Sequence, residues 1–303
     1  MNVLSLFDGI SCGQLVLKKL GVNVENYFAS EIDKYAIKVT QHNFPNTVQL
    51  GDVYNVKGTD LPKIDLLLGG FPCQTFSRSN SNRPEFDDPR GKLYLECIRL
   101  MKECNPKYFL FENVVMSKFA KGVISDAFGV EPVSINANCY SAQNRERLFW
   151  TNIPFTRTRT TISDIVFADI VEDIEHNWKE IPKDRSYIIE DYNSPNGLRW
   201  VCGIRSKKQG SLPIDHKPKM FDFSQSSRIY DYEGKSPTLA TSDTIRMTDD
   251  ISKGRYRQAT PIEWERLQGL PDDFTIAVSA SRRKHAVGNG WNVDVIMDIL
   301  KDM

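Results

Sequence analysis

The hydrophobic positions of the first 155 residues form short apolar runs that alternate with segments of helical periodicity. Buried strands are expected at Val3–Leu6, Tyr27–Ser30, Asp65–Leu68, Tyr108–Phe111, Val133–Ala137 and Leu148–Asn152. Helices are expected at Gln14–Leu20, Lys34–Asn43 and Leu93–Cys104. Strands that alternate with helices predict an α/β fold, in which a mostly parallel sheet carries helices on both faces.

The pattern changes near residue 155. From there to residue 257 the periodicity weakens, and turn-forming residues gather in segments such as Asn193–Gly197, which predicts a smaller, loop-rich domain with short strands. Helical periodicity returns at Pro261–Leu270 and at Asn292–Lys301, and the apolar face of the last segment predicts packing against the first domain. The expected domains are therefore a larger one, residues 1–155 plus 285–303, and a smaller one, residues 156–284.

Composition narrows the class of protein only slightly. The chain has 39 basic and 39 acidic side chains, and the net charge of zero neither indicates nor excludes a nucleic-acid partner. No apolar run reaches the roughly 18 residues of a membrane span, and the N-terminus lacks the basic region of a signal peptide, so we expect a cytoplasmic monomer without membrane contact. The six cysteines are scattered without Cys-x-x-Cys pairs, which argues against disulfides and against a metal site.

Residues able to carry chemistry follow the predicted strands. They are Phe7–Gly9, Glu31, Asp52, Pro72–Cys73 and Glu112. Because ligands of parallel sheets bind beyond the carboxyl ends of the strands, we expect these residues to meet in one site.

Cys73 differs from the other five cysteines, which we expect to be small buried side chains. It follows a strand, then Gly69, Gly70 and Pro72, and glycines allow a ligand to approach the backbone closely. A cysteine on such a turn can act as a thiolate nucleophile if its pKa is lowered from about 8.5.

Five segments, in order along the chain, resemble the motifs of the C5 cytosine-specific DNA methyltransferases. They are Gly-Gly-Phe-Pro-Cys-Gln-Thr-Phe-Ser at 69–77, Glu-Asn-Val at 112–114, Gln-Asn-Arg-Glu-Arg at 143–147, Arg-Leu-Gln-Gly-Leu-Pro-Asp at 266–272 and Gly-Asn-Gly at 288–290. The resemblance implies a Rossmann-like sheet that binds S-adenosylmethionine, together with a smaller target-recognition domain. It implies transfer of a methyl group to carbon 5 of cytosine in double-stranded DNA, with S-adenosylhomocysteine as the second product.

The resemblance also implies the catalytic residues. Cys73 would add to carbon 6 of the cytosine, and Glu112 would protonate or hydrogen bond N3, for which a desolvated pocket raises the pKa of a carboxyl group. Arg145 and Arg147 would support the cytosine O2 and the active-site loop by electrostatic attraction.

Further residues match the cofactor positions of this family. In that comparison, Glu31 would bind the ribose hydroxyls, Ile32 would pack on the adenine and Asp52 would accept from the adenine amino group. The complete cofactor set is Phe7, Asp8, Gly9, Ser11, Gly13, Glu31, Ile32, Asp52, Val53, Pro72, Leu93, Asn289, Gly290 and Trp291. Two features depart from the usual pattern. The first loop has Ser11 and Cys12 where glycine is more common, and Trp291 follows Gly290, as in the vertebrate de novo methyltransferases.

Contact with DNA is expected from basic and polar residues, although each basic patch is equally consistent with solvated surface charge. The loop after the nucleophile has the composition of a lid that closes over DNA. A first basic patch lies between residues 199 and 219. A second includes Lys253, Arg255 and Arg257, and a third is Arg282–Lys284. The residues proposed to contact DNA are Arg78, Ser79, Arg83, Arg90, Arg205, Lys207, Lys208 and Arg257.

Alternative functions are weighed on particular residues. A tRNA-directed branch of the family carries a Cys-Phe-Thr signature that this sequence lacks, and a catalytically silent homologue would have lost Cys73 or Glu112. An amino-methyltransferase would have a Pro-Pro-aromatic motif where Phe-Pro-Cys-Gln stands. A partner restriction endonuclease and a solitary protective role are both consistent with the sequence.

Overall fold

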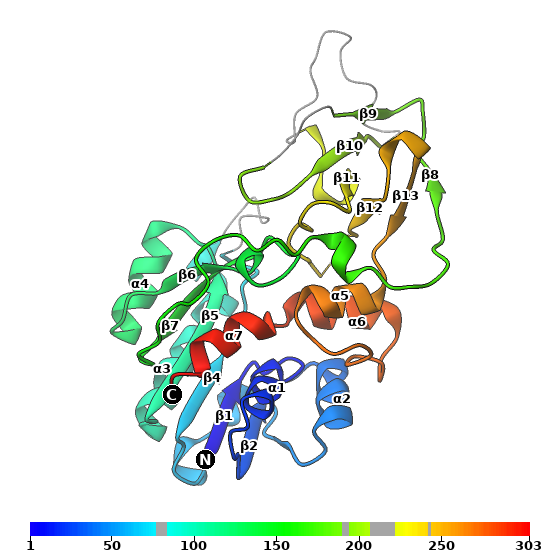
Figure 1. Cartoon of the computed structure of the whole chain (residues 1–303). Coiled ribbons are helices and arrows are strands. Elements are labelled where there is room, and N and C mark those ends of the chain that lie inside the picture. Colours follow the sequence, from blue (N-terminus) through cyan, green and yellow to red (C-terminus); the bar gives the residue numbers. More distant parts are fainter. Residues whose placement is uncertain (77–83, 190–193, 207–221, 242–243) are drawn as a thin grey trace.

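The computed structural model describes residues 1–76, 84–189, 194–206, 222–241 and 244–303. The described strands form two sheets, one near each end of the molecule (Figure 1). The larger sheet has seven strands in the order β3-β2-β1-β4-β5-β7-β6. Their bounds are β1 Asn2–Leu6, β2 Asn26–Ser30, β3 Val48–Gln49, β4 Leu66–Gly69, β5 Tyr108–Val114, β6 Val133–Asn136 and β7 Glu146–Thr151.

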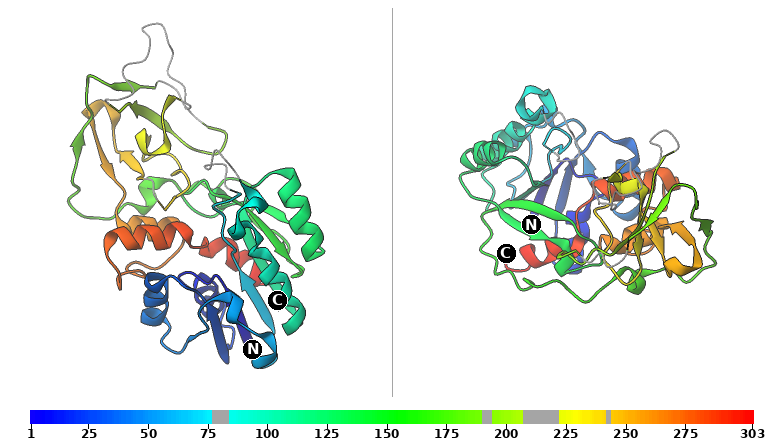
Figure 2. Two further views of the ribbon diagram at one scale, coloured as in Figure 1. Left: turned by 180° about the vertical axis from the view of Figure 1, so that it is seen from behind. Right: turned by 90° about the horizontal axis from the view of Figure 1, so that it is seen from above.

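Most strands of the larger sheet are parallel, and β7 runs antiparallel to both β5 and β6. Helices α1 (Cys12–Lys19), α2 (Lys34–Asn43) and α7 (Val293–Leu300) cover one face, and α3 (Tyr94–Cys104) and α4 (Lys118–Phe128) cover the other (Figure 2). Because strand side chains alternate between faces, the sheet buries apolar residues on both sides. The expected Rossmann-like α/β fold is confirmed.

The smaller sheet has six strands in the order β8-β13-β12-β11-β10-β9. Their bounds are β8 Lys179–Glu180, β9 Ser186–Ile188, β10 Trp200–Ile204, β11 Arg228–Asp231, β12 Arg246–Thr248 and β13 Arg255–Gln258. All are short, as the weak periodicity predicts, and only β11 and β12 pair in parallel. One hydrophobic cluster continues from α1 and α7 to Trp200, Tyr230 and Met247 of this sheet. The division at residues 155 and 284 therefore stays a prediction, since the two sheets share a core.

Helices α5 (Pro261–Leu267) and α6 (Ala280–Asn289) lie between the two sheets (Figure 1). Sequence periodicity did not predict α4, α6 or β3. It also ended β5 at Phe111, whereas the strand continues to Val114 and pairs Glu112 with Phe149 of β7. Glu112 is therefore a strand residue, which fixes its backbone more firmly than a loop would. No helix among the described residues is both long and apolar enough to cross a lipid bilayer.

Candidate active site

An open cleft of about 1250 Å³, solvent at its mouth included, lies at the carboxyl ends of β1, β2, β4 and β5. It brings together the four predicted catalytic residues, Cys73, Glu112, Arg145 and Arg147. Nine of the predicted cofactor residues also line it: Phe7, Gly9, Glu31, Ile32, Asp52, Val53, Pro72, Leu93 and Asn289. Residues far apart in the chain thus meet where the parallel sheet predicts a ligand site.

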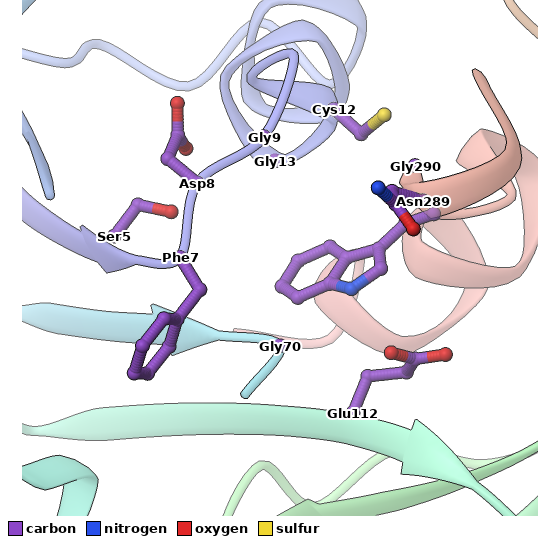
Figure 3. Close-up of a pocket in the computed structure, with 11 residues that line it drawn as sticks. Ser5, Phe7, Asp8, Gly9, Cys12, Gly13, Gly70, Glu112, Asn289 and Gly290 are labelled. Carbon is purple, nitrogen blue, oxygen red and sulfur yellow. The ribbon is translucent and has the colours of Figure 1, made fainter. Parts of the chain in front are cut away.

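A smaller cavity adjoins the cleft and shares Phe7, Gly9, Gly70, Glu112 and Asn289 with it (Figure 3). The predicted cofactor residues Asp8, Gly13, Gly290 and Trp291 line this smaller cavity. Ser11 lines neither space, because its side chain is fully buried beneath the first loop.

The turn that carries Cys73 is held from both sides. The Asn113 side chain donates to the carbonyl oxygen of Phe71 (3.0 Å), and the Phe76 amide donates to the carbonyl oxygen of Cys73 (3.0 Å). A methyl group on Gly70 would lie 2.9 Å from Nε1 of Trp291, so glycine is required at that close approach. The backbone around the thiol is therefore fixed by neighbouring elements.

Cys73 lies among charged groups of both signs. Burial raises the pKa of its thiol, and the negative charge of Glu112 acts in the same direction, whereas Arg147 and Arg145 oppose them. Glu112 forms an ion pair with Arg147, with 3.0 Å between Oε1 and Nε. The surroundings of the thiol in the free protein therefore disfavour its ionised form.

Arg145 is buried and contacts the backbone of three distant positions. Its guanidinium donates to the carbonyl oxygens of Leu239 (3.3 Å), Gly288 (3.2 Å) and Gly290 (3.0 Å). Burial lowers its pKa to about 9, so the group still carries its charge at neutral pH. Arg145 thus joins β7 to the segment that ends in Trp291, a structural role that the sequence motif did not reveal.

Glu31 organises the turn after β2. Its carboxylate accepts from the backbone amides of Gly9 (2.8 Å), Ile32 (2.7 Å) and Asp33 (2.8 Å). The side chain of Ile32 is 76% exposed on the cleft wall, an unusual position for a large aliphatic residue. An exposed apolar side chain next to a fixed carboxylate can bind a ligand that has both an apolar face and hydroxyl groups.

The wall opposite includes Asp52, whose carboxylate accepts from the Tyr54 amide at 3.1 Å. Tyr54 and His285 also line the cleft, although sequence comparison did not select them. The side chain of Tyr54 is 61% exposed, and its place directly after Asp52-Val53 is the signal that could have identified it.

Asp8 and Ser11 form a polar layer beneath the first loop. Asp8 accepts hydrogen bonds from the hydroxyls of Ser11 and of Tyr27, the latter at 2.9 Å. Burial raises the pKa of Asp8 to about 6. Phe7 and Ser11 have φ angles of 54° and 57°, a left-handed conformation that glycine adopts more readily. The loop therefore keeps its shape without the extra glycines that are usual there.

Comparison with known proteins decides the class. The model of the C-5 cytosine-specific DNA methylases matches residues 1–303, which is the whole chain. The chain belongs to this family.

Its relatives include both type II and orphan methyltransferases. The methylase is 28% identical to the type II methyltransferase M1.ScrFI of Lactococcus lactis subsp. cremoris, over 100% of this chain and 77% of that protein. It is 28% identical to the type II methyltransferase M.FnuDI of Fusobacterium nucleatum, over 99% and 93%. It is 36% identical to the orphan methyltransferase M.Rho11sI of Bacillus phage rho11s, over 81% of this chain but only 58% of the phage protein.

Solved structures support the fold. The S. pombe Dnmt2 methyltransferase superposes with a TM-score of 0.67 at 16% identity, covering 99% of this chain and 97% of that one. The Entamoeba histolytica methyltransferase EhMeth superposes with a TM-score of 0.68 at 14% identity, covering 99% and 96%. At these identities the likeness concerns the arrangement of the chain alone.

The structure describes only some of the residues predicted to contact DNA. Arg78, Ser79, Arg83, Lys207 and Lys208 lie outside the described residues. Arg90 is exposed and forms an ion pair with Asp88 (2.7 Å), and Arg205 is half-buried at the end of β10. A contact between either arginine and DNA stays a prediction.

The proposed contact of Arg257 with DNA is wrong, because this side chain is buried. Its guanidinium donates to both oxygens of Glu263 at 2.7 Å. It also lies over the aromatic ring of Tyr232, 5.0 Å from the ring centre. Arg255 and Lys253, from the same basic patch, both pair with Asp249. This basic run therefore forms ion pairs within the protein, one of them buried and two near the surface.

Two residues of the third basic patch, Arg283 and Arg282, also have partners within the protein. Arg283 pairs with Glu265 (2.9 Å) and Asp273 (3.1 Å), and Arg282 lies 4.1 Å from the centre of the Tyr35 ring. These contacts anchor α6, which leads to Asn289 and Gly290, so the patch supports the cleft from behind.

Proposed function

We propose that this methylase transfers a methyl group from S-adenosylmethionine to carbon 5 of a cytosine that is flipped out of a specific sequence in double-stranded DNA. The proposal rests on one observation: Cys73, Glu112, Arg145 and Arg147 line the same cleft as the predicted cofactor residues. Cys73 and Glu112 supply the two groups that addition to a pyrimidine requires.

The residues of the cleft fit the cofactor. Glu31, Ile32 and the Asp52–Tyr54 turn face the space where a ribose and a flat base would be held, and the first loop surrounds the smaller cavity behind it. S-adenosylmethionine, when bound, supplies the electrophilic methyl group. Glu31 keeps one lone pair, on Oε2, for a ribose hydroxyl, because each carboxylate oxygen can accept about two hydrogen bonds and Oε1 already accepts two.

The reaction is expected to begin with ionisation of Cys73. Entry of the target base into the cleft brings the thiol next to carbon 6, and loss of its proton allows a carbon–sulfur bond to form. Negative charge then develops on the ring, where Glu112 hydrogen bonds N3 and Arg147 stabilises the charge. After methylation, carbon 5 would lose its proton to solvent and the sulfur would leave carbon 6 with the electron pair of the carbon–sulfur bond, which restores the aromatic ring. The thiolate would then take up a proton, which restores the free enzyme.

DNA is proposed to bind between the two sheets, next to the cleft at the carboxyl ends of the strands of the larger sheet. A base inside a duplex cannot reach Cys73 at the floor of the cleft, and it must therefore rotate out of the stack. Unstacking costs a few kcal/mol, which contacts from the smaller sheet and the loop after Cys73 would offset.

Bisulfite sequencing of duplex DNA that has been incubated with the purified enzyme and S-adenosylmethionine tests this function. Methylated cytosines in one sequence context are expected. Methylation of tRNA alone, or of no substrate, would refute the proposal. Protection of the methylated DNA from the endonucleases of the source strain would distinguish a restriction partner from a solitary protective enzyme.

Replacement of Cys73 with Ser tests the covalent step. Cys73→Ser should lower turnover by at least about 10³-fold, because a serine hydroxyl is a far weaker nucleophile at neutral pH. DNA affinity, measured by a gel-shift titration, should stay within about twofold of the wild type. A variant that keeps full turnover would exclude the adduct.

A further inference from the structure

We propose that Arg99, a residue of α3 outside the cleft, is a positioning residue that sets the affinity for the cofactor. It would do so by holding the wall formed by Asp52, Val53 and Tyr54. The inference rests on the proposed function, because it assumes that this wall binds S-adenosylmethionine.

The wall is a short 3₁₀ turn, η1 (Val53–Asn55), between β3 and the segment that leads to β4. Its internal hydrogen bonds are few: the Asn55 amide donates to Asp52 and the Val56 amide donates to Val53. A turn of this length has little stability of its own, so its shape depends on contacts from other elements.

Arg99 provides such contacts. Its Nη2 donates to the carbonyl oxygen of Val53 (3.0 Å), and its Nη1 donates to that of Val56 (2.9 Å). The two carbonyl groups belong to Val53 and Val56, at the two ends of the turn. The guanidinium therefore fixes both ends of the turn whose other side faces the cofactor space.

Arg99 is itself held in place by two acids, each about one helical turn from it on either side. Glu96 contacts its Nε (2.8 Å) and Nη2 (2.7 Å), and Glu103 accepts from its Nη1 (2.9 Å). Together with the two contacts to carbonyl groups, these three make five contacts, one for each N–H group of the guanidinium. Glu103 also accepts from the amide of Gly58 (2.7 Å), which extends the same support along the segment.

Lysine cannot reproduce this arrangement, because its three donors radiate from one atom and lack the fork of the guanidinium. Arg99→Lys retains the charge between Glu96 and Glu103 but cannot reach both carbonyl groups. Arg99→Gln removes the charge as well. Both variants leave every cleft-lining side chain unchanged.

Arg266 is a matched control within the same chain. It also donates to two backbone carbonyls, of Ile170 (3.1 Å) and Val171 (3.0 Å), and pairs with Asp272. Its side chain is 30% exposed, compared with 31% for Arg99, but it does not line the cleft. Arg266→Gln should therefore cost similar stability without touching the cofactor wall.

Calorimetric titration of the full-length protein with S-adenosylhomocysteine tests the inference. Arg99→Gln should raise the Kd about tenfold, and Arg99→Lys by about half that factor, since two hydrogen bonds that hold the wall are lost. Arg266→Gln should bind as the wild type does. In turnover assays the KM for S-adenosylmethionine should rise while kcat and the KM for DNA remain unchanged.

The outcomes separate the two proposals. A wild-type protein that does not bind S-adenosylhomocysteine would overturn the proposed function itself. Normal wild-type binding with unchanged binding by Arg99→Gln would overturn only the role of Arg99. Equal losses in Arg99→Gln and Arg266→Gln would mean that both changes act through general stability, and would overturn it too. If Arg99→Gln does not fold, Arg99→Lys carries the same test.

Discussion

Asp8 illustrates how burying one carboxyl group among neutral partners costs stability. Its partners Ser11 and Tyr27 are neutral hydroxyls, and burial raises its pKa to about 6. A carboxylate in this position is retained most simply for a positively charged ligand. We expect S-adenosylmethionine, which carries a sulfonium and an ammonium group, to supply that charge.

A pH prediction follows for the ligand-free enzyme. An unfolded aspartate has a pKa of about 3.9, so the folded state holds the Asp8 proton more tightly. The free energy of unfolding should therefore fall as the pH rises from about 4 to about 6, by about 2–3 kcal/mol from this group. Asp8→Asn should remove that loss and raise the Tm at pH 8, measured by thermal denaturation. If Asp8→Asn lowers the Tm relative to the wild type, and by more at pH 8 than at pH 5, the raised pKa of Asp8 is contradicted.

At the scale of elements, the contact between β13 and α5 fixes the smaller sheet to the region of the cleft. Arg257 and Glu263 are both buried, and Glu263 also accepts from the amides of Thr260 (2.8 Å) and Glu172 (3.1 Å). One carboxylate thus joins a strand, a helix cap and the linker between the sheets.

Breaking this buried pair should be costly. Glu263→Gln leaves the Arg257 charge buried without its counter-ion, and it should lower the free energy of unfolding by about 3–5 kcal/mol. The double variant Arg257→Met with Glu263→Leu should recover part of that loss, because no charge is then buried. The recovery should be incomplete, because the amides of Thr260 and Glu172 lose their acceptor. Arg255→Gln, which breaks an exposed pair with Asp249, should cost less than about 1 kcal/mol. Urea denaturation of the three variants checks the order.

Elements with strong apolar periodicity were predictable from sequence, and those whose residues serve other purposes were not. Helix α2 was predicted with its full bounds, and β1, β2 and β4 to within a residue. Helix α6 was missed because its Arg282–Lys284 run is polar, and the partners of that run lie elsewhere in the chain. In α4 the buried positions Ala120, Ile124 and Phe128 are spaced four residues apart, a pattern that is typical of a helix.

The site residues that belong to a sequence motif were predictable. The roles that depend on contacts between distant segments were not. The positions of Cys73 and Glu112 in one cleft agree with the motifs. The backbone bonds of Arg145 and the burial of Arg257 depend on segments that are distant in sequence, and no local pattern encodes them.

On the scale of the whole molecule, cofactor and DNA sequence are expected to be read by different sheets. The predicted cofactor residues in the cleft lie near the strand ends of the larger sheet and in α6, whereas β8 to β13 form the smaller sheet. The shared hydrophobic cluster joins the two sheets, which the proposed binding of DNA between them requires.

A chimaera tests this division of labour. Exchange of the smaller sheet for the corresponding segment of M.FnuDI should change the methylated sequence context and leave the Kd for S-adenosylhomocysteine unchanged. Bisulfite sequencing and calorimetry would provide the two readouts. A folded chimaera that retains the original sequence context would place recognition outside the smaller sheet.

The close approach of Gly70 to Trp291 also bears on how such enzymes diverge. Any side chain at position 70 collides with the indole ring, so the glycine is required for as long as the tryptophan is present. The order of mutation then matters: a smaller residue must first replace Trp291, and only afterwards can position 70 vary without penalty. Descendants of this gene are therefore expected to inherit the two residues as a pair, and to lose them in that order.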